Sequence, residues 1–137
     1  MKRISRREAR ETALKVLYAY EITKPEDMGE FFDETCLDHE LPKDDFSYEL
    51  YANAIMNSEK EDSYIIKYAQ DWDITRLSKI TLSILRLCIC EFLYFPDIPN
   101  RVSMNEYIEL SKIYGEDNSR SFINGIINNV NKEMENK

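Results

Sequence analysis

The stretch ITRLSKITLSILRLCICEFLYF, residues 74–95, decides the fold of this chain. Its apolar residues fall on nearly every side of a helix instead of along one stripe, and such a helix is buried on most of its circumference. Pro96 and Pro99 then end the helix, because proline lacks an amide hydrogen and restricts the residue before it. The stretch therefore predicts one long helix at the centre of a bundle, with other helices packed around it.

The rest of the chain also has the pattern of helices. Only three glycines and four prolines occur in 137 residues, and apolar residues repeat at helical spacing without an alternating strand pattern. Beside the central helix, six more are expected at about residues 5–22, 26–37, 44–56, 58–69, 101–114 and 119–130. The predicted fold class is therefore all-α, a compact bundle of about seven helices in a single domain that spans residues 1–137.

Helix-capping residues support several of these boundaries. Ser5 stands before the first helix with Glu8 three residues later, which is the spacing of a capping box. Ser58 and Glu61 repeat that spacing at the fourth helix, and Gly115 stands where the sixth helix is expected to end. We therefore expect Ser58 to cap the fourth helix and Glu61 to complete its capping box.

Charge is distributed unevenly along the chain. The net charge is -8, yet the first 15 residues carry six basic and two acidic side chains, whereas the other 122 carry 12 basic and 24 acidic ones. A basic segment on an acidic body favours a polyanionic partner that binds at one place. The acidic body should repel nucleic acid elsewhere.

Arg6, Arg7 and Arg10 are the candidate phosphate contacts of this basic segment. On a helix they share an arc of roughly 100° beside the apolar face, and guanidinium groups bind phosphate oxygens in paired geometry. Lys2 and Arg3 precede the helix and would extend the basic surface. The alternative is an ordinary solvated helix face whose arginines pair with neighbouring acids.

Further candidate RNA-binding residues lie at two places. Tyr18 is at the edge of the first helix, where an exposed ring beside arginines can stack on an unpaired base, and the alternative is a partly buried packing residue. The second group surrounds the end of the sixth helix and the start of the seventh: Lys112, Tyr114, Asn118 and Ser119. Free backbone N–H groups at a helix start attract phosphate. Ordinary helix capping by Asn118 or Ser119 is the alternative there, and both roles can hold at once.

Other classes of function find little support. Cys88 and Cys90 face roughly opposite ways on a helix, which suits neither a disulfide nor zinc, and the only histidine, His39, lies in a polar stretch. We find no phosphate-cradling glycine loop and no acids at metal-ligand spacing. No apolar run reaches the ~18–20 residues of a membrane span, and no signal peptide is evident. We expect a cytoplasmic, non-enzymatic protein with buried free thiols and without metal, cofactor, membrane or small-molecule partner.

Four motifs follow one another along nearly the whole chain. They are the N-terminal RREARETALKVLYAYE, the central LSKITLSILRLCICEF, the segment IPNRVSMNEYIELSKIYG and the closing SRSFINGIINNV. Together they resemble the family of the bacterial transcription antitermination factor NusB. The resemblance implies seven helices in two packed halves, which would correspond to about residues 1–70 and 71–137 here.

The resemblance also implies a function. Family members bind the boxA element of nascent RNA as a heterodimer with NusE, a small-subunit ribosomal protein, and the complex helps RNA polymerase read through terminators, notably in ribosomal RNA operons. The same fold occurs as the N-terminal domain of a ribosomal RNA cytosine methyltransferase, whose long cofactor-binding domain follows it, whereas this chain ends at Lys137. Two alternatives stay open: a helical protein-interaction module without direct RNA binding, and a stand-alone relative of the RNA-binding domain of that methyltransferase.

The central helix carries a narrow polar stripe that includes Arg76, Lys79 and Arg86. Arg86 lies deep in an apolar helix and needs a partner if it is buried. The resemblance places an arginine and a glutamate at positions 86 and 106, so we expect a structural ion pair between Arg86 and Glu106. Arg76 and Lys79 are open between solvent, RNA and the protein partner.

Overall fold

The computed structural model describes residues 3–70 and 73–135, and within them every regular element is helical. The elements are α1 (Arg6–Thr23), α2 (Met28–Asp38), α3 (Asp45–Met56), α4 (Ser58–Ala69), the 3₁₀ turn η1 (Ile74–Arg76), α5 (Lys79–Tyr94), α6 (Asn100–Tyr114) and α7 (Arg120–Glu135). The prediction of an all-α fold with seven helices is confirmed.

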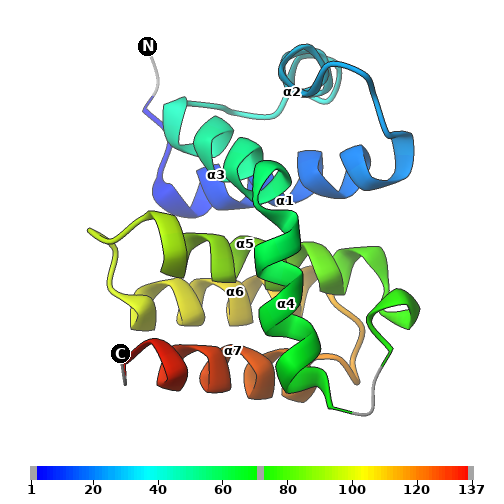
Figure 1. Ribbon diagram of the computed structural model, residues 1–137. Coiled ribbons are helices and arrows are strands. Elements are labelled where there is room, and N and C mark those ends of the chain that lie inside the picture. Colours follow the sequence, from blue (N-terminus) through cyan, green and yellow to red (C-terminus); the bar gives the residue numbers. More distant parts are fainter. Residues whose placement is uncertain (1–2, 71–72, 136–137) are drawn as a thin grey trace.

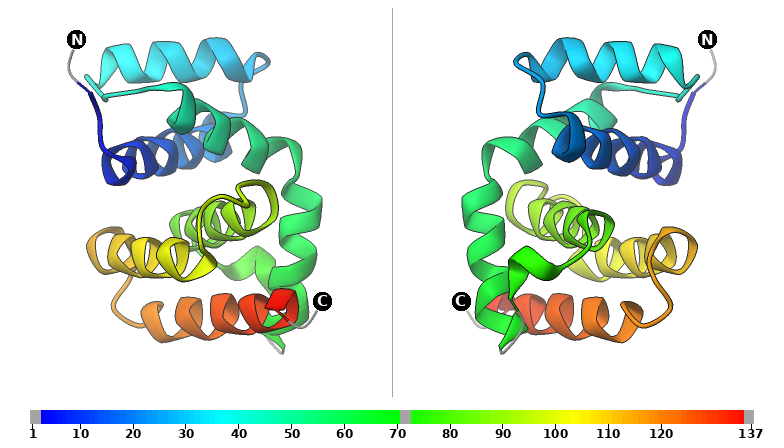
Figure 2. Two further views of the ribbon diagram at one scale, coloured as in Figure 1. Left: turned by 90° about the vertical axis from the view of Figure 1, so that its left-hand side faces the viewer. Right: turned by 90° about the vertical axis from the view of Figure 1, so that its right-hand side faces the viewer.

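The helices form two packed groups that are joined by α4. One group holds α1, α2 and α3 and the other holds α5, α6 and α7, while α4 runs across both (Figure 1). The side views show α2 outermost at one end and α7 outermost at the other (Figure 2). Because α4 packs on α5 and α7 and also contacts α3, residues 58–69 tie the two groups together. The predicted boundary near residue 70 stays a prediction.

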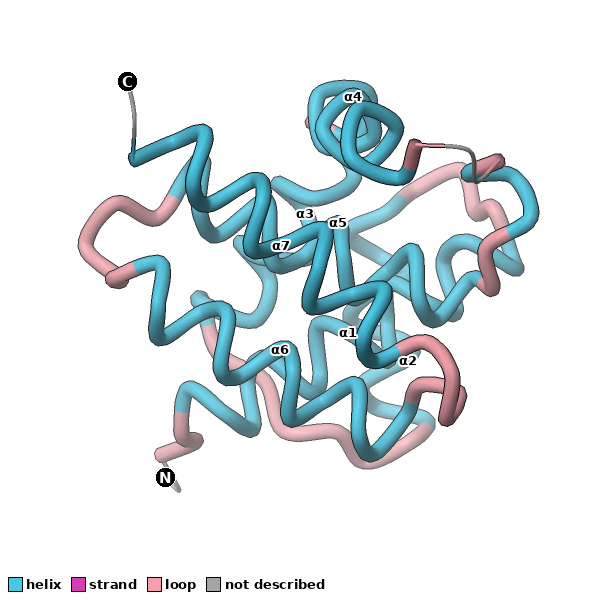
Figure 3. The backbone as a smooth tube through the Cα atoms, turned by 90° about the horizontal axis from the view of Figure 1, so that it is seen from below, coloured by secondary structure: helices cyan, strands magenta, loops and turns pink. Residues whose placement is uncertain are grey.

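The central position of α5 follows from its sequence. It contacts α1, α3, α4, α6 and α7, and a view from below shows α4, α6 and α7 around it (Figure 3). Leu85, Leu87, Cys88 and Ile89 are fully buried. A helix with apolar residues on most sides is therefore covered on most sides, as its pattern predicts.

The central helix begins later than the sequence predicts. Residues Ile74–Arg76 form a single 3₁₀ turn, and α5 starts only at Lys79. Ser78 explains the restart, because its hydroxyl accepts a hydrogen bond from the backbone N–H of Thr81 at 3.2 Å and so caps α5. Arg76 therefore stands outside α5 and does not continue the polar stripe of that helix.

The predicted cap of α1 is present, but that of α4 is not. Ser5 and Glu8 form both bonds of a capping box. At α4, Ser58 is the first helical residue, and Asn57 is the N-cap without a side-chain cap bond. The predicted capping box of Ser58 and Glu61 is wrong, because the first turn of α4 places the Glu61 side chain in the core instead of beside the helix end.

Arg86 pairs with carboxylates other than the predicted one. Its Nε and Nη2 atoms donate to the two carboxylate oxygens of Asp62 at 2.7 Å each, and its Nη1 lies 3.1 Å from a carboxylate oxygen of Glu21. The predicted Arg86–Glu106 pair is wrong, since Glu106 accepts from Arg7 instead. The reason is that α4 and the end of α1 cover this side of α5, whereas α6 packs on another side.

A second ion pair lies in the interior and joins three helices. Arg10 on α1 donates from Nε and Nη2 to the two carboxylate oxygens of Glu91 on α5, at 2.8 and 2.9 Å. Ser103 on α6 donates to the same carboxylate at 2.8 Å. The side chains of Arg10 and Glu91 are only 4% and 0% exposed. Burial acts to lower the pKa of Arg10, but its bonds to the Glu91 carboxylate outweigh this effect and raise the pKa overall.

Glu61 is a third buried ionisable residue, and it has no such ion pair. Its side chain is fully buried, and among the described residues its carboxylate oxygens have no N–H or O–H donor. The neighbouring thiol of Cys90 is the group that acts on the carboxylate by hydrogen bonding. The nearby Arg86 already pairs with Asp62 and Glu21. Burial raises the pKa of Glu61 to about 9, although the charge of Arg86 acts to lower it. Glu61 is therefore a neutral carboxylic acid at pH 7.

The buried Arg10–Glu91 pair gives a stability prediction. Arg10→Ala should leave the Glu91 carboxylate buried and unpaired, and should lower the free energy of unfolding by about 3–5 kcal/mol. Glu91→Ala should cost about as much, and the double variant should lose less than the sum of the two. Urea unfolding of the four proteins measures this coupling. Strict additivity of the two single effects would show that the pair does not act as a unit.

Glu61 gives a pH-dependent prediction. The folded protein should hold the Glu61 proton up to about pH 9, whereas the unfolded chain releases it near the ordinary pKa of about 4.3. Because the unfolded state binds fewer protons between these values, stability should fall as the pH rises through this range. Glu61→Gln removes the titration, so it should flatten the fall and raise the melting temperature at pH 8. Identical melting curves of both proteins from pH 5 to 9 would contradict the buried neutral acid.

Candidate nucleic-acid interface

The three arginines predicted to contact phosphate turn toward three different helices. The guanidinium carbon of Arg6 lies 3.8 Å from the centroid of the Phe46 ring on α3, Arg10 is buried against α5, and Arg7 reaches Glu106 on α6. In projection down a helix of 3.6 residues per turn, Arg10 falls between the other two. The side of α1 that faces the core lies in the middle of the predicted arc, so Arg10 is buried. The structure therefore contradicts the prediction of Arg10 as a phosphate contact.

Arg7 is the member of this group that combines exposure with an ion pair. Its Nε and Nη2 atoms donate to the two carboxylate oxygens of Glu106 at 2.9 and 3.1 Å. The Arg7 side chain is nevertheless 68% exposed, and that of Glu106 is 20% exposed. The hydrogen bonds from Arg7 lower the pKa of Glu106, so the carboxylate is charged at neutral pH.

Arg7 begins a row of side chains that faces α6. Lys15 and Tyr18 follow it along α1 at helical spacing, and α6 runs in the same direction as α1 (Figure 1). Arg7 meets Glu106 at one end of the row, and the Nζ atom of Lys15 lies 5.8 Å from the ring centroid of Tyr114 at the other. We call this row, made of Arg7, Lys15, Tyr18, Glu106 and Tyr114, the α1–α6 seam.

A pocket of about 590 Å³ lies at the far end of the seam. We call it the tyrosine pocket, and its lining residues are Leu14, Lys15, Tyr18, Ala19, Thr35, His39, Leu41, Ile80 and Tyr114. Tyr18 is 39% exposed, so the structure leaves its ring accessible as the stacking prediction requires. Aromatic rings and apolar walls beside a cation can bind an unstacked base next to its phosphate.

The second predicted group is divided between two places. Tyr114 joins the tyrosine pocket, whereas Asn118 and Ser119 line a separate pocket of about 150 Å³ together with Arg76. Asn118 is exposed, but Ser119 is 9% exposed and its hydroxyl donates to a backbone carbonyl at 2.8 Å. Lys112 is bonded to an acid on its own helix at 2.9 Å. Of this group, only Tyr114 belongs to the α1–α6 seam.

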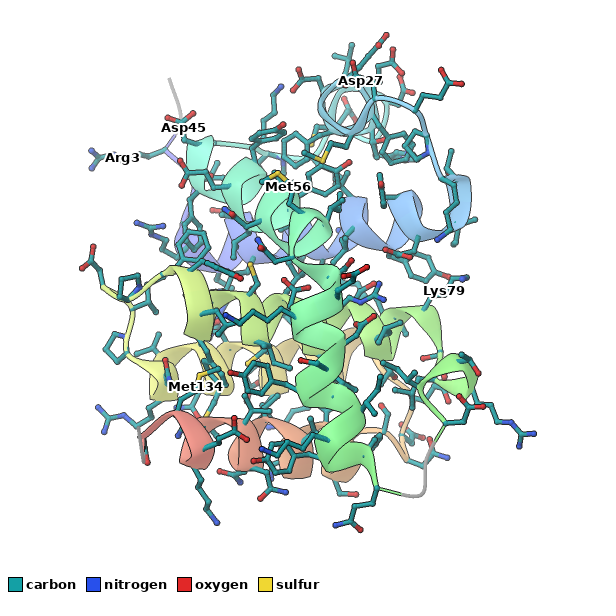
Figure 4. All side chains as sticks on the ribbon, in the orientation of Figure 1. Arg3, Asp27, Asp45, Met56, Lys79 and Met134 are labelled. Carbon is teal, nitrogen blue, oxygen red and sulfur yellow. The ribbon has the colours of Figure 1, made fainter. Side chains whose placement is uncertain are left out.

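The remaining basic candidates lie near the ends of the bundle. Arg3 is exposed and projects away from the helices (Figure 4). Lys79 is exposed at the start of α5, on the opposite side of the molecule in the same view. Lys2 lies outside the described residues. Arg3 is therefore the candidate that can extend the basic surface beyond the start of α1.

Sequence reasoning missed three residues of the tyrosine pocket that carry polar groups. Lys15 stands eight residues after Arg7, a spacing that puts both on one side of α1, and this signal was available. Thr35 and His39 come from α2 and the residue after it. Their position depends on how α2 packs on α1, which no local pattern reveals.

Metal and membrane binding find no support within residues 3–70 and 73–135. No group of three or more His, Cys, Asp and Glu side chains is placed there to hold a metal ion. No described helix is long and apolar enough to cross a membrane. Cys36, Cys88 and Cys90 are buried free thiols, as predicted, and burial raises the pKa of each.

Comparison with known proteins gives a consistent family. The model of the NusB family matches residues 7–132. The chain is 38% identical over 136 residues to the transcription antitermination protein NusB of Listeria monocytogenes serotype 4a, covering 95% of this chain and 98% of that protein. It is 36% identical over 138 residues to the NusB of Chloroherpeton thalassium, covering 98% of this chain but only 64% of that longer protein.

Solved structures agree with this result. NusB of T. maritima matches with a TM-score of 0.83 at 31% identity, over 96% of this chain and 94% of that one. A chain in the crystal structure of the antitermination factors NusB and NusE in complex with double-stranded RNA matches with a TM-score of 0.81 at 27% identity, over 93% and 96%. Fold, family model and relatives lead to one conclusion: the chain belongs to the NusB family.

Proposed function

We propose that this chain is an RNA-binding transcription antitermination factor. It binds the boxA element of single-stranded nascent RNA together with NusE, within the antitermination complex of RNA polymerase, and promotes processive transcription of ribosomal RNA operons. Relatives named as NusB antitermination proteins, and a similar chain in a structure with NusE and RNA, support this role. The role requires no catalytic group, cofactor or small-molecule substrate, and it belongs in the cytoplasm.

The α1–α6 seam is the observation that supports RNA binding most strongly. On a protein of net charge -8, the exposed cations Arg7 and Lys15 stand on one side of α1, about 12 Å apart along the helix axis. The tyrosine pocket follows directly, with Tyr18 and Tyr114 in its wall. An extended strand can therefore place phosphates at the two cations and one unstacked base in the pocket. Arg3 and Arg6 can add further phosphate contacts.

NusE enlarges this small surface. A few cations and one pocket give modest affinity when the chain is alone, because most of the remaining surface is acidic. A second protein on the same RNA adds contacts, and binding of either component then favours the other reciprocally. We therefore expect tight, sequence-selective binding only for the pair.

The seam gives a salt-dependence prediction. Replacing Arg7 and Lys15 with alanine should keep the fold, because both side chains are exposed and alanine is a good helix former. RNA binding should weaken, and the slope of log affinity against log salt should become shallower by about 1.4, since each phosphate contact on a single strand contributes about 0.7. Fluorescence anisotropy with a short boxA RNA at several salt concentrations, with and without NusE, measures both quantities.

A matched control is Lys60→Ala, which removes an exposed cation from α4, on the opposite side of the bundle from α6 (Figure 2). This variant should keep the wild-type slope. An unchanged slope in the Arg7 and Lys15 double variant would place the RNA elsewhere on the protein. RNA binding by the wild type that is weak and insensitive to salt would instead favour a protein-interaction module.

The tyrosine pocket gives a second binding prediction. Tyr18→Ala should lose about 1–3 kcal/mol of RNA affinity, which is the usual contribution of stacking one base on an aromatic ring. Tyr18→Phe keeps the ring and should keep most of the affinity. Because stacking does not depend on charge, the salt slope of both variants should match that of the wild type. Equal affinity of the alanine variant and the wild type would remove the pocket from the RNA site.

A further inference from the structure

Arg7 and Arg6 are neighbours, yet their surroundings differ in one respect. Both carboxylate oxygens of Glu106 accept hydrogen bonds from Arg7. The guanidinium of Arg6 lies instead over the face of the Phe46 ring, and the ring carries no negative charge to neutralise it. Glu109 lies close enough to act on Arg7 electrostatically, but its own hydrogen bond is with Lys112, at 2.9 Å. Glu106 is thus the acid that accepts the hydrogen bonds of the Arg7 guanidinium.

We propose that Glu106 is a built-in competitor for RNA phosphate at Arg7. The inference rests on the proposed RNA-binding function. A carboxylate and a phosphate both bind the paired N–H groups of a guanidinium. In the free protein the Glu106 carboxylate takes that place, and a phosphate of the bound strand exchanges with it. Glu106 then determines how much of the Arg7 charge is available to RNA.

The exposure of the pair fits an exchange. A half-exposed pair contributes little to folding, because water and salt screen it and the arginine loses mobility in forming it. The geometry of Arg7–Glu106 resembles that of the buried Arg10–Glu91 pair, with two N–H groups on two oxygens in each. Breaking the buried pair would leave two desolvated charges, whereas breaking the Arg7–Glu106 pair leaves a solvated arginine and a carboxylate that is 20% exposed. Glu106 can therefore release Arg7 at a lower cost than Glu91 could release Arg10.

The exchange would reduce indiscriminate RNA binding. A strand that touches only Arg7 gains little, because it must displace one anion to bind another. A strand that also engages Lys15 and the tyrosine pocket has further contacts that offset the displacement. A carboxylate can also have the opposite role and hold an arginine in position for its ligand. The two roles predict opposite signs when the carboxylate is removed.

Glu106→Gln tests the inference, because it removes the charge and keeps the shape. The probe is the short boxA RNA, measured by fluorescence anisotropy at low and high salt. The variant should bind about two- to fivefold more tightly at low salt, the range expected for removing one exposed ion-pair partner. The salt slope should change by less than about 0.7, because Arg7 contacts one phosphate in both proteins and only its competition with Glu106 differs. Thermal melts should stay close to the wild type.

Two further variants separate a specific effect from a general one. Glu109→Gln removes a negative charge from the same helix without breaking a hydrogen bond to Arg7, and serves as the matched charge control. In an Arg7→Ala background, the gain from Glu106→Gln should fall to the general charge effect that Glu109→Gln shows, whereas the gain from Glu109→Gln should remain. Weaker binding of Glu106→Gln, or an equal gain with and without Arg7, would overturn the competitor.

The outcome also distinguishes this inference from the proposed function. If Arg7→Ala weakens RNA binding but Glu106→Gln does not strengthen it, the competitor fails and the RNA-binding role of Arg7 stands. If neither the wild type nor Glu106→Gln binds the RNA in a salt-dependent way, the proposed function itself fails, and the competitor fails with it.

Discussion

The buried bond between Arg10 and Glu91 fixes how α1 sits on the rest of the molecule. A carboxylate without solvent needs a partner of opposite charge, and the Nε–Nη2 edge of Arg10 supplies two N–H groups in one plane. Ser103 holds the same carboxylate from α6, so α1, α5 and α6 meet at one point. Because the bond sets the rotation of α1 about its axis, it also sets which side of α1 faces α6. Arg7, Lys15 and Tyr18 lie on that side.

Arginine–carboxylate pairs of similar geometry therefore have different roles in this protein. The exposed fraction of the arginine side chain distinguishes these roles. Arg10 and Arg86 have small exposed fractions, 4% and 11%, and each joins separate helices through carboxylates that lie far along the sequence. Arg7 is 68% exposed, and its carboxylate partner Glu106 is 20% exposed. The basic segment of an acidic chain thus supplies a buried ion pair between helices and, in the proposed function, a surface for a polyanion. Neither role can be assigned from the arginine residues alone.

Local patterns in the sequence predicted the features that depend on local spacing. The number of helices, the burial of α5 and the capping box of Ser5 follow from periodicity and from residues three or four positions apart. The ion-pair partners do not, because they depend on the rotation of each helix and on its neighbours. Arg86 meets Asp62 on α4 and not Glu106 on α6, and only the packing of α4 reveals this.

The candidate site was predictable to a similar extent. Tyr18 and Tyr114 were each expected near RNA, but their convergence in one pocket depends on the parallel course of α1 and α6. His39 joins that pocket from the end of α2, although its polar sequence neighbourhood indicated only a surface position. In the same way, Glu61 has the spacing of a capping residue, and only the packing of α4 on α5 shows that it is buried.

Arginine side-chain NMR during an RNA titration tests this division of roles most directly. The Nε–H signals of Arg7 and Arg10 can be followed while single-stranded boxA RNA is added to the protein. If α1 is anchored by Arg10 and presents Arg7, the Arg7 signal should shift in proportion to the bound fraction, because phosphate replaces or joins its carboxylate. The Arg10 signal should stay in place, since its Nε–H donates to Glu91 in both states. A shift at Arg10 with none at Arg7 would contradict the assignment of the two arginines.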